Sequence, residues 1–181
     1  MYVSCIIEWY DVSSRDRDFP MSNAARSASI LGFAMGIFIA GCSGVPPSNL
    51  GVRDGRLAPC PSSPNCVSSQ STDREHAVEP LSYTTSTVEA MADLKKIILS
   101  MKRTRIVSES DDYIHAEFTS AILRFVDDVE FYFDDAAKVI HVRSASRLGK
   151  SDFGVNRKRV DEIRRAWKTS RQGLSSTQMK R

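Results

Sequence analysis

Residues 123–159 decide the fold, and they read LRFVDDVEFYFDDAAKVIHVRSASRLGKSDFGVNRKR. Apolar and polar side chains alternate on either side of the turn-forming DDAAK at residues 134–138. This period of two predicts two strands, residues 121–133 and residues 139–146, that are joined by a turn. We expect them to pair as an antiparallel β-hairpin.

The hairpin and the residues that follow it are rich in charge. The register that aligns the apolar faces of the two strands puts Glu130 opposite Arg143. Arg157, Lys158 and Arg159 follow in the first turn of the predicted last helix. Cations are unfavourable there by roughly 0.3–1 kcal/mol each, because the helix dipole is positive at that end. We therefore expect an anion nearby, either an acid of the protein or a bound phosphate, lipid headgroup or glycan acid.

The charged and polar residues of this region form one candidate binding surface. Its members are Asp127, Asp128, Glu130, Arg143, Ser144, Ser146, Arg147, Asp152, Asn156, Arg157 and Arg159. Three hypotheses stay open. Acids and bases neutralise one another on a solvated face, or the face binds an anionic envelope component. In the third, Asp128 and Glu130 raise each other's pKa and form a hydrolytic acid/base pair, of which a metal-bound version adds His141.

The rest of the chain supplies the core on which the hairpin packs. Ser86 and Glu89 fit the S-x-x-E capping box, and an apolar stripe at helical spacing follows them. Two further strands are predicted at residues 104–109 and 113–120, and a second helix begins near Asn156. We expect an α+β domain, a four-stranded antiparallel meander with both helices packed on one face and its polar face open to solvent.

The N-terminal residues read as an export signal. Residues 30–39 are apolar but too few for an ordinary membrane span. They end in IAGC, which resembles a bacterial lipobox, where cleavage precedes a cysteine, here Cys42, that then carries diacylglycerol. Residues 1–20 are too acidic for the start of a signal, so we expect translation from Met21. An uncleaved anchor and a cytosolic protein with an apolar N-terminus are the alternatives.

The signal predicts that the protein is located in the bacterial cell envelope. Acyl chains such as palmitate on Cys42 would hold the protein to a membrane, facing the periplasm, and two or more chains make such an anchor stable. Ser43 in place of Asp resembles sorting to the outer membrane, which we favour over the inner one. Residues 42–50 are then a tether, residues 51–168 a single domain and residues 169–181 a disordered tail.

Cys60 and Cys66 enclose the short loop CPSSPNC in the turn-rich residues 51–71. Outside the cytoplasm an even pair of cysteines indicates a disulfide. A metal site and a redox pair are the alternatives. Two thiols, however, supply only half of the ligands of a structural zinc site, and the spacing is not the C-x-x-C of redox pairs. We expect a structural disulfide that staples this segment into an ordered coil; a mobile extension is the alternative.

The composition bounds the class of protein. A chain of 181 residues with 41% hydrophobic and 26% charged residues is typical of one globular domain with a core. The net charge of +3 and the predicted export argue against nucleic acid as a partner. Gly149, Lys150 and Ser151 resemble the end of a P-loop, but Ser144 stands where the first glycine is required. We expect no cofactor, and an anionic lipid, a glycan or an envelope protein as partner.

Three stretches taken together resemble a known family: GRLAPCPSSPNCVSSQ (55–70), FVDDVEF (125–131) and RSASRLGKSDFGVNRKRVDEIR (143–164). The family is catalogued as domain of unknown function 1499 and occurs in bacteria, often as predicted lipoproteins or exported proteins, and in plastids. The resemblance covers about residues 51–168 and departs at Lys150, where the family has a bulkier, often aromatic residue. The resemblance implies the fold and the cellular location but no catalytic residue. Its motifs include the candidate binding surface, which favours a working surface over salt bridges that only neutralise one another. We expect a binding or accessory module rather than an enzyme.

Overall fold

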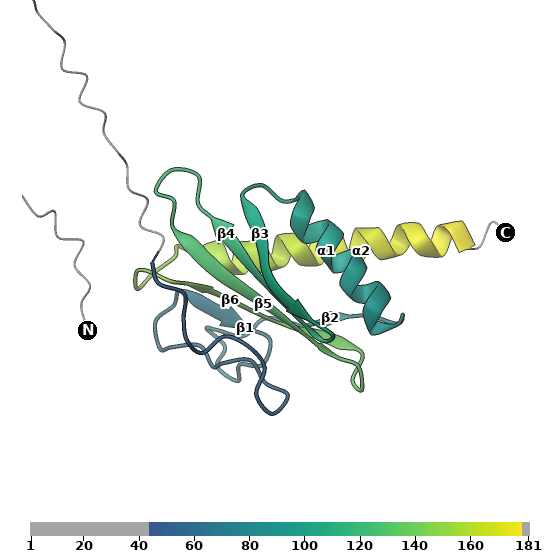
Figure 1. Cartoon of the computed structure of the whole chain (residues 1–181), viewed down its shortest axis with the longest axis horizontal. Coiled ribbons are helices and arrows are strands. Elements are labelled where there is room, and N and C mark those ends of the chain that lie inside the picture. The colour runs from purple at the N-terminus through teal and green to yellow at the C-terminus, as the bar shows by residue number, and fades with distance from the viewer. Residues whose placement is uncertain (1–43, 179–181) are drawn as a thin grey trace, which may run out of the picture. The chain divides into compact units, whose positions relative to one another are not determined.

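The computed structural model describes residues 44–178, which form two helices and six strands (Figure 1). The elements in chain order are β1 (Cys66–Ser68), β2 (Leu81–Ser82), α1 (Thr87–Ser100), β3 (Thr104–Ser110), β4 (Tyr113–Thr119), β5 (Val126–Asp134), β6 (Val139–Ser146) and α2 (Val155–Gln178). The fold class is α+β, as predicted. The predicted export signal, the start at Met21 and the lipidated Cys42 lie outside the described residues.

All six strands belong to one antiparallel sheet. Its order is β1–β6–β5–β4–β3, and β2 also pairs with β6. The four long strands follow one another as a meander, but the predicted count of four strands was wrong. The strands β1 and β2 are only three and two residues long, too short to show an alternating pattern. They are strands because each pairs with β6.

Both helices begin close to the predicted positions. The side chain of Ser86 accepts a hydrogen bond from the N–H of Glu89, whose carboxylate accepts one from the N–H of Ser86, so the capping box is confirmed. Helix α2 starts at Val155 and continues to Gln178, so the tail predicted from residue 169 onward is helical to that point. Neither described helix combines the length and the apolar composition needed to cross a membrane.

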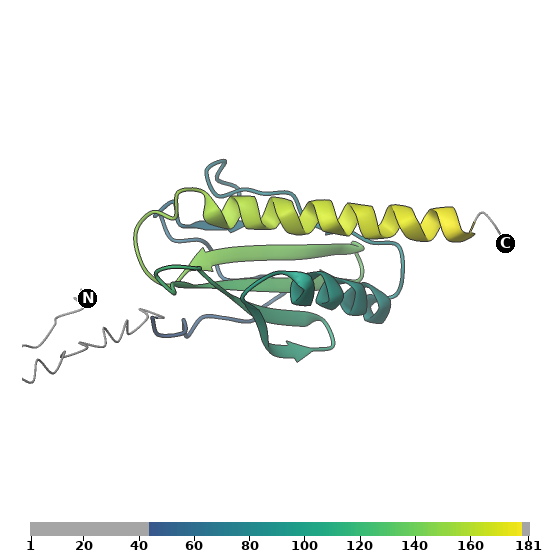
Figure 2. The ribbon, with the colours of Figure 1, turned by 90° about the horizontal axis from the view of Figure 1, so that it is seen from above.

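The core lies between the sheet and the two helices (Figure 2). Helix α1 packs against β3, whereas α2 packs against β6 and β1, and the helices also contact each other, which refines the expected packing. Apolar side chains such as Leu94 of α1, Ile163 of α2 and Phe131 of β5 fill the space between them. Trp167 also donates a hydrogen bond of 2.9 Å to the carbonyl of Ser82, which ties α2 to β2.

The second face of the sheet carries polar side chains and is buried, so the predicted solvated face was wrong. Asp128 and Glu130 are 0% exposed and Arg143 is 4% exposed. The coil that precedes β1 covers them on the side of the sheet away from the helices (Figure 1), and the N–H of Gly51 donates a hydrogen bond to Glu130. No periodic pattern marks this coil, so the alternation within the strands could not reveal it.

The predicted disulfide between Cys60 and Cys66 is confirmed, and it joins the coil to β1. Asn65, next to it, donates hydrogen bonds from its side chain to the carbonyls of Ser146 and Gly149. The disulfide loop is therefore also held to the end of β6, beside the start of α2.

Candidate functional site

The residues of the candidate binding surface lie on both faces of the sheet. Successive strand residues point to opposite faces, so the neighbours Asp127 and Asp128 are separated. The polar-face cluster consists of His115, Glu117, Asp128, Glu130, Arg143 and Arg147. The helix-start cluster lies on the other face and consists of Asp127, Ser144, Ser146, Asp152, Asn156, Arg157 and Arg159. The structure thus divides the predicted surface into two clusters.

Arg147 links the acids of the polar-face cluster. It donates two hydrogen bonds to Asp128, from Nε to Oδ2 at 2.8 Å and from Nη2 to Oδ1 at 2.7 Å. Its Nη2 also donates to Oε1 of Glu117 at 2.5 Å. The Nε2 atom of His115 lies 2.8 Å from Oδ1 of Asp128. Both oxygens of this buried carboxylate are therefore engaged by cationic or hydrogen-bonding partners.

Glu130 is the second fully buried acid of the cluster. It lies opposite Arg143, which confirms the predicted register, and it accepts a hydrogen bond from Nη1 at 3.0 Å. Its other oxygen accepts hydrogen bonds from the Tyr113 hydroxyl at 2.9 Å and from the N–H of Gly51 at 2.8 Å. Burial and the charge of Glu130 raise the pKa of Tyr113, so the phenol stays protonated and donates.

The arginines keep the neighbouring acids ionised although burial opposes it. Burial alone would raise the pKa of Asp128, but the hydrogen bonds from Arg147 and His115 outweigh it and the pKa is lowered. In the same way, Arg105 and Arg147 outweigh burial and lower the pKa of Glu117. The hydrogen bond with Asp128 in turn raises the pKa of Arg147. The acids thus act as counter-ions rather than as proton donors.

The structure does not assemble the metal-bound version of the site, with Asp128, Glu130 and His141. His141 stacks on Tyr132, and its Nδ1 lies 3.2 Å from the Ser69 hydroxyl, while the two acids pair with other residues. Among residues 44–178, no group of three or more His, Cys, Asp or Glu side chains is placed to hold a metal ion.

Asp152 and Asn156 fix the start of α2. The carboxylate of Asp152 accepts hydrogen bonds from the N–H groups of Gly154 and Asn156 at 2.9 and 2.7 Å, and so satisfies backbone donors that a helix start leaves free. Asn156 is 0% exposed; it accepts a hydrogen bond from Ser144 Oγ at 2.6 Å and donates one to Ser146 Oγ at 2.9 Å. The first turn is thereby attached to β6.

The three cations of this turn have different surroundings. Arg159 Nη2 lies 2.5 Å from Asp127 Oδ2, and its guanidinium lies over the Phe118 ring, 4.8 Å from the centroid. Arg157 donates hydrogen bonds to two backbone carbonyls in the segment before β2. Lys158 is exposed. The anion expected near this turn is therefore present in the protein itself, as the carboxylate of Asp127.

A cleft opens beside the Arg159–Asp127 pair, between the residues that follow α1 and the first turns of α2; we call it the helix-end cleft. Its charged lining residues are Lys102, Arg103, Lys158, Arg159, Asp127 and Glu162. Because Asp127 is already paired, the cleft carries an excess of positive charge next to the positive end of the α2 dipole. The sequence pattern did not point to Lys102 and Arg103, because only the packing of α1 beside α2 brings them there.

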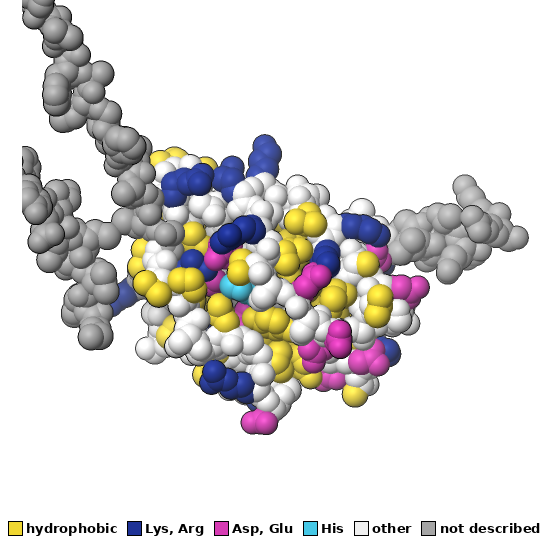
Figure 3. All heavy atoms as spheres, in the orientation of Figure 1, with side chains coloured by type: hydrophobic (Ala, Val, Ile, Leu, Met, Phe, Trp, Pro, Cys, Tyr) yellow, Lys and Arg dark blue, Asp and Glu magenta, His cyan; other side chains and the backbone are white. Residues whose placement is uncertain are grey.

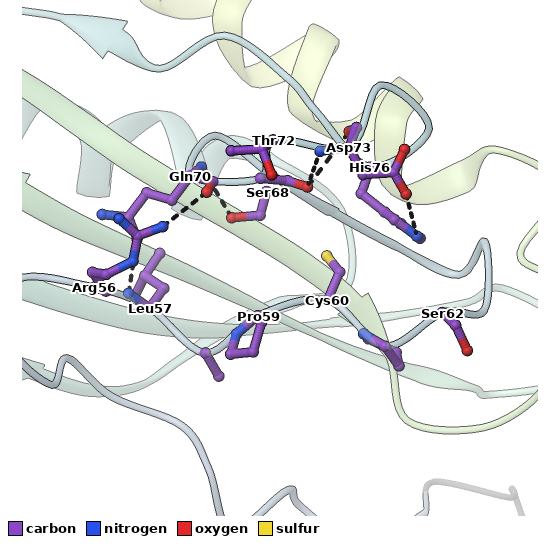
Figure 4. Close-up of a pocket in the computed structure, with 13 residues that line it drawn as sticks. Arg56, Leu57, Pro59, Cys60, Ser62, Ser68, Gln70, Thr72, Asp73 and His76 are labelled. Carbon is purple, nitrogen blue, oxygen red and sulfur yellow. Dashed lines mark hydrogen bonds and ion pairs between the residues drawn. The ribbon is translucent and has the colours of Figure 1, made fainter.

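A second pocket, also not predicted, lies beside the disulfide (Figure 4). The side chain of Gln70 accepts a hydrogen bond from the N–H of Leu57 at 2.8 Å and donates one to the carbonyl of Gly55 at 2.9 Å. Nδ1 of His76 donates a hydrogen bond of 2.9 Å to the carbonyl of Cys66. These polar groups hold the coil to the residues around β1, and we assign them a structural role.

Comparison with models of known protein families gives a match. A family model described as "Protein of unknown function (DUF1499)" matches residues 56–167, which is more than half of the chain. The matched region contains the disulfide, both clusters and the helix-end cleft. Comparisons with curated proteins and with solved structures gave no significant match.

Proposed function

The chain belongs to the DUF1499 family, and from this premise we propose that it is a lipid-anchored envelope protein that binds an anionic envelope component in the helix-end cleft. The family assigns no chemistry, so the proposal follows from charge and access. The ligand is a lipid or glycan that carries phosphate or carboxylate groups. Its role is binding rather than catalysis.

The excess of positive charge in an open cleft carries this proposal. Arg159 is positioned in advance, because its Nη1 donates hydrogen bonds to Ser144 Oγ at 3.0 Å and to Asn156 Oδ1 at 2.6 Å. Because Asp127 already neutralises this guanidinium, the positive charge available to a ligand comes from the other three cations of the cleft, Lys102, Arg103 and Lys158. Lys102 and Lys158 are exposed around it and add charge without being tied to the fold.

The export part of the proposal is supported by two features of the chain. The first is the lipobox-like ending at Cys42, followed by Ser43, which favours the outer membrane. The second is the disulfide between Cys60 and Cys66, since disulfides persist in oxidising compartments such as the periplasm and are rare in the cytosol. An acyl anchor would hold the cleft close to a surface that is rich in anionic groups.

The hydrolytic alternative, with Asp128 and Glu130 as an acid/base pair, has less support. Both side chains are 0% exposed, and they are ion-paired with Arg147 and Arg143. A general acid that works near neutral pH needs a raised pKa, whereas that of Asp128 is lowered. We therefore place the function in the open cleft.

A soluble anion tests the cleft without involving a membrane. Glycerol 1-phosphate represents phosphate headgroups and galacturonate represents acidic glycans, and binding is followed by NMR chemical-shift titration. We expect the double variant Lys102→Gln, Lys158→Gln to bind about tenfold more weakly, since an exposed charge pair contributes up to about 1 kcal/mol. The matched control, Lys96→Gln with Lys168→Gln, removes the same charge outside the cleft and should bind like the parent. Equal binding by all three chains would contradict the proposal.

The anchor is tested separately, in cells that are fed a labelled fatty acid. The variant Cys42→Ala should take up no label and should leave the membrane fraction, because no thiol remains to be acylated. Label retained by the variant would show that the anchor is elsewhere.

A further inference from the structure

Two loops and the first described residue meet at one end of the sheet, which we call the loop end (left in Figure 1). Residues 120–125 join β4 to β5, and residues 147–154 join β6 to α2. The N–H of Arg147 donates a hydrogen bond of 3.2 Å to the carbonyl of the first residue of β5, which holds the loops side by side. Gly44 lies against the second loop, because a Cβ added to it would be 3.1 Å from Leu148 Cγ.

Exposed apolar side chains concentrate at the loop end. Among residues 44–172, whose side chains are described, ten large apolar side chains are exposed. Seven of these are Val45 and six residues of the loops and the helix start: Ile122, Leu123, Phe125, Leu148, Phe153 and Val155. Ile122 is 83% exposed and Phe153 is 90% exposed. Figure 3 shows yellow apolar side chains on this end of the molecule. An exposed apolar patch of this kind marks an interaction surface.

The aromatic side chain of Phe153 is not buried within the protein, so packing in the fold does not explain it. Its backbone φ is +54°, a left-handed conformation that is unfavourable for a bulky residue. Asp152 fixes the turn by accepting a hydrogen bond from the N–H of Gly154. The phenyl ring is thus held out into solvent, and no burial offsets the strain of its backbone. An apolar phase outside the protein would supply that burial.

The charge around this patch is positive. Arg124 and Lys150 are exposed within the two loops, and Arg103 and Lys158 follow on the rim of the helix-end cleft. The single acid of the two loops, Asp152, uses both carboxylate oxygens to accept backbone hydrogen bonds at the start of α2. Apolar and aromatic side chains among exposed cations match the interface of a membrane with anionic headgroups.

The short distance in sequence from Gly44 to Cys42 limits how far the loop end can lie from a membrane. Two residue steps separate them in the sequence, and a fully extended chain spans at most about 3.6 Å per residue, so the chain between them can reach no further than roughly 7 Å. An acylated Cys42 would therefore keep this end close to the headgroups.

We propose that the loop end is a membrane-docking surface: Ile122 and Phe153 insert into the interface of an anionic bilayer, and Arg124 and Lys150 bind its phosphate groups. The inference rests on the lipid anchor of the proposed function for its geometry. The helix-end cleft shares Ser120 with the loop end. Docking therefore brings the cleft to the level of the headgroups.

Insertion is tested by tryptophan fluorescence on the full chain, purified from membranes and reconstituted into vesicles of phosphatidylglycerol and brominated phosphatidylcholine. Bromine on the acyl chains quenches only tryptophans that enter the bilayer. After subtraction of the parent signal, we expect quenching for Phe153→Trp and none for Val88→Trp, which is placed at another exposed apolar position, on α1. Absence of quenching at position 153 in chains that float with the vesicles overturns the docking surface, and so does failure to float.

The role of the cations is tested in the Phe153→Trp chain. Adding Arg124→Gln and Lys150→Gln should lower the ratio of docked to undocked protein at least about tenfold, because each basic residue near an anionic surface contributes to binding. The effect should disappear in vesicles of phosphatidylcholine alone. The control pair Lys96→Gln and Lys168→Gln should change nothing in either vesicle. Equal quenching with and without the two loop cations in anionic vesicles overturns their role.

The docking surface and the cleft can fail separately. If position 153 is not quenched while glycerol 1-phosphate still binds the cleft, docking is wrong and the proposed function stands. If position 153 is quenched while neither soluble anion binds, the docking surface stands and the function proposed for the cleft is wrong.

Discussion

Asp127 and Asp128 are neighbours in β5 and each has an arginine partner, but they belong to different regions of the molecule. Asp128 pairs with Arg147 beneath the coil that covers the polar face, and it is 0% exposed. Asp127 pairs with Arg159 on the opposite face, where the helix-end cleft is open to solvent. Two adjacent residues with the same chemistry thus contribute to a closed cluster and to the wall of an open cleft, although Asp127 itself is only 8% exposed.

The difference shows that access, rather than the number of charges, separates a structural ion pair from a binding site. Removing charges from water is costly, and a buried pair offsets this cost only when its remaining donors and acceptors are also satisfied. The polar-face cluster meets most of this demand with groups from β4, β5 and β6, from Arg147 just after β6, and from the coil. The cleft has exposed lysines instead, which can exchange water for a ligand.

The largest expected effect is the loss of Arg147 from the closed region. Arg147→Met should lower the free energy of unfolding by about 3–5 kcal/mol, because it leaves the buried Asp128 without its main cation and Glu117 with Arg105 alone. The side chain of Arg147 is 4% exposed. Denaturant unfolding of parent and variant at neutral pH measures the change.

The matched control for this prediction is Arg105→Met. Arg105 pairs with the same Glu117, but its side chain is 70% exposed, so the loss should be at most about 1 kcal/mol. Equal losses for the two variants would mean that the polar face is hydrated in solution and that the contrast between the regions is wrong.

A smaller effect is expected when the coil that closes the polar face is released. The double variant Cys60→Ala, Cys66→Ala removes a short cross-link and should lower the free energy of unfolding by about 2 kcal/mol. Hydrogen exchange at the Gly51 amide, which donates to Glu130, should become faster in the variant. Unchanged exchange at this amide would show that the coil holds the polar face closed without the disulfide.

The smallest effect near neutral pH is expected from titration of Asp128. Its pKa in the folded protein lies below the ordinary value of about 4, so its contribution to stability is complete above that value and is lost as the pH falls through the lowered pKa. Denaturant unfolding from neutral to acidic pH should show no loss from this group above about pH 5. Below that range, the gap in stability between the parent and Asp128→Asn should narrow. Parallel profiles down to strongly acidic pH would contradict the assignment.

The parts of the fold that could be predicted depend on local periodicity and local chemistry. The four long strands show a period of two, and the capping box at Ser86 satisfies backbone donors of its own first turn. The pairing of Glu130 with Arg143 follows from the hairpin register. Strands β1 and β2 were missed, because their pairing with β6 is decided by residues far away in the chain.

The sequence by itself determined the order of the main elements, the Cys60–Cys66 disulfide and the presence of opposite charges around β5 and β6, since each of these is encoded within a few neighbouring residues. Only the tertiary structure decided which of those charges are accessible. Burial depends on what lies over a surface, and here an aperiodic coil covers one face of the sheet, while the two helices leave a basic cleft at the edge of the other.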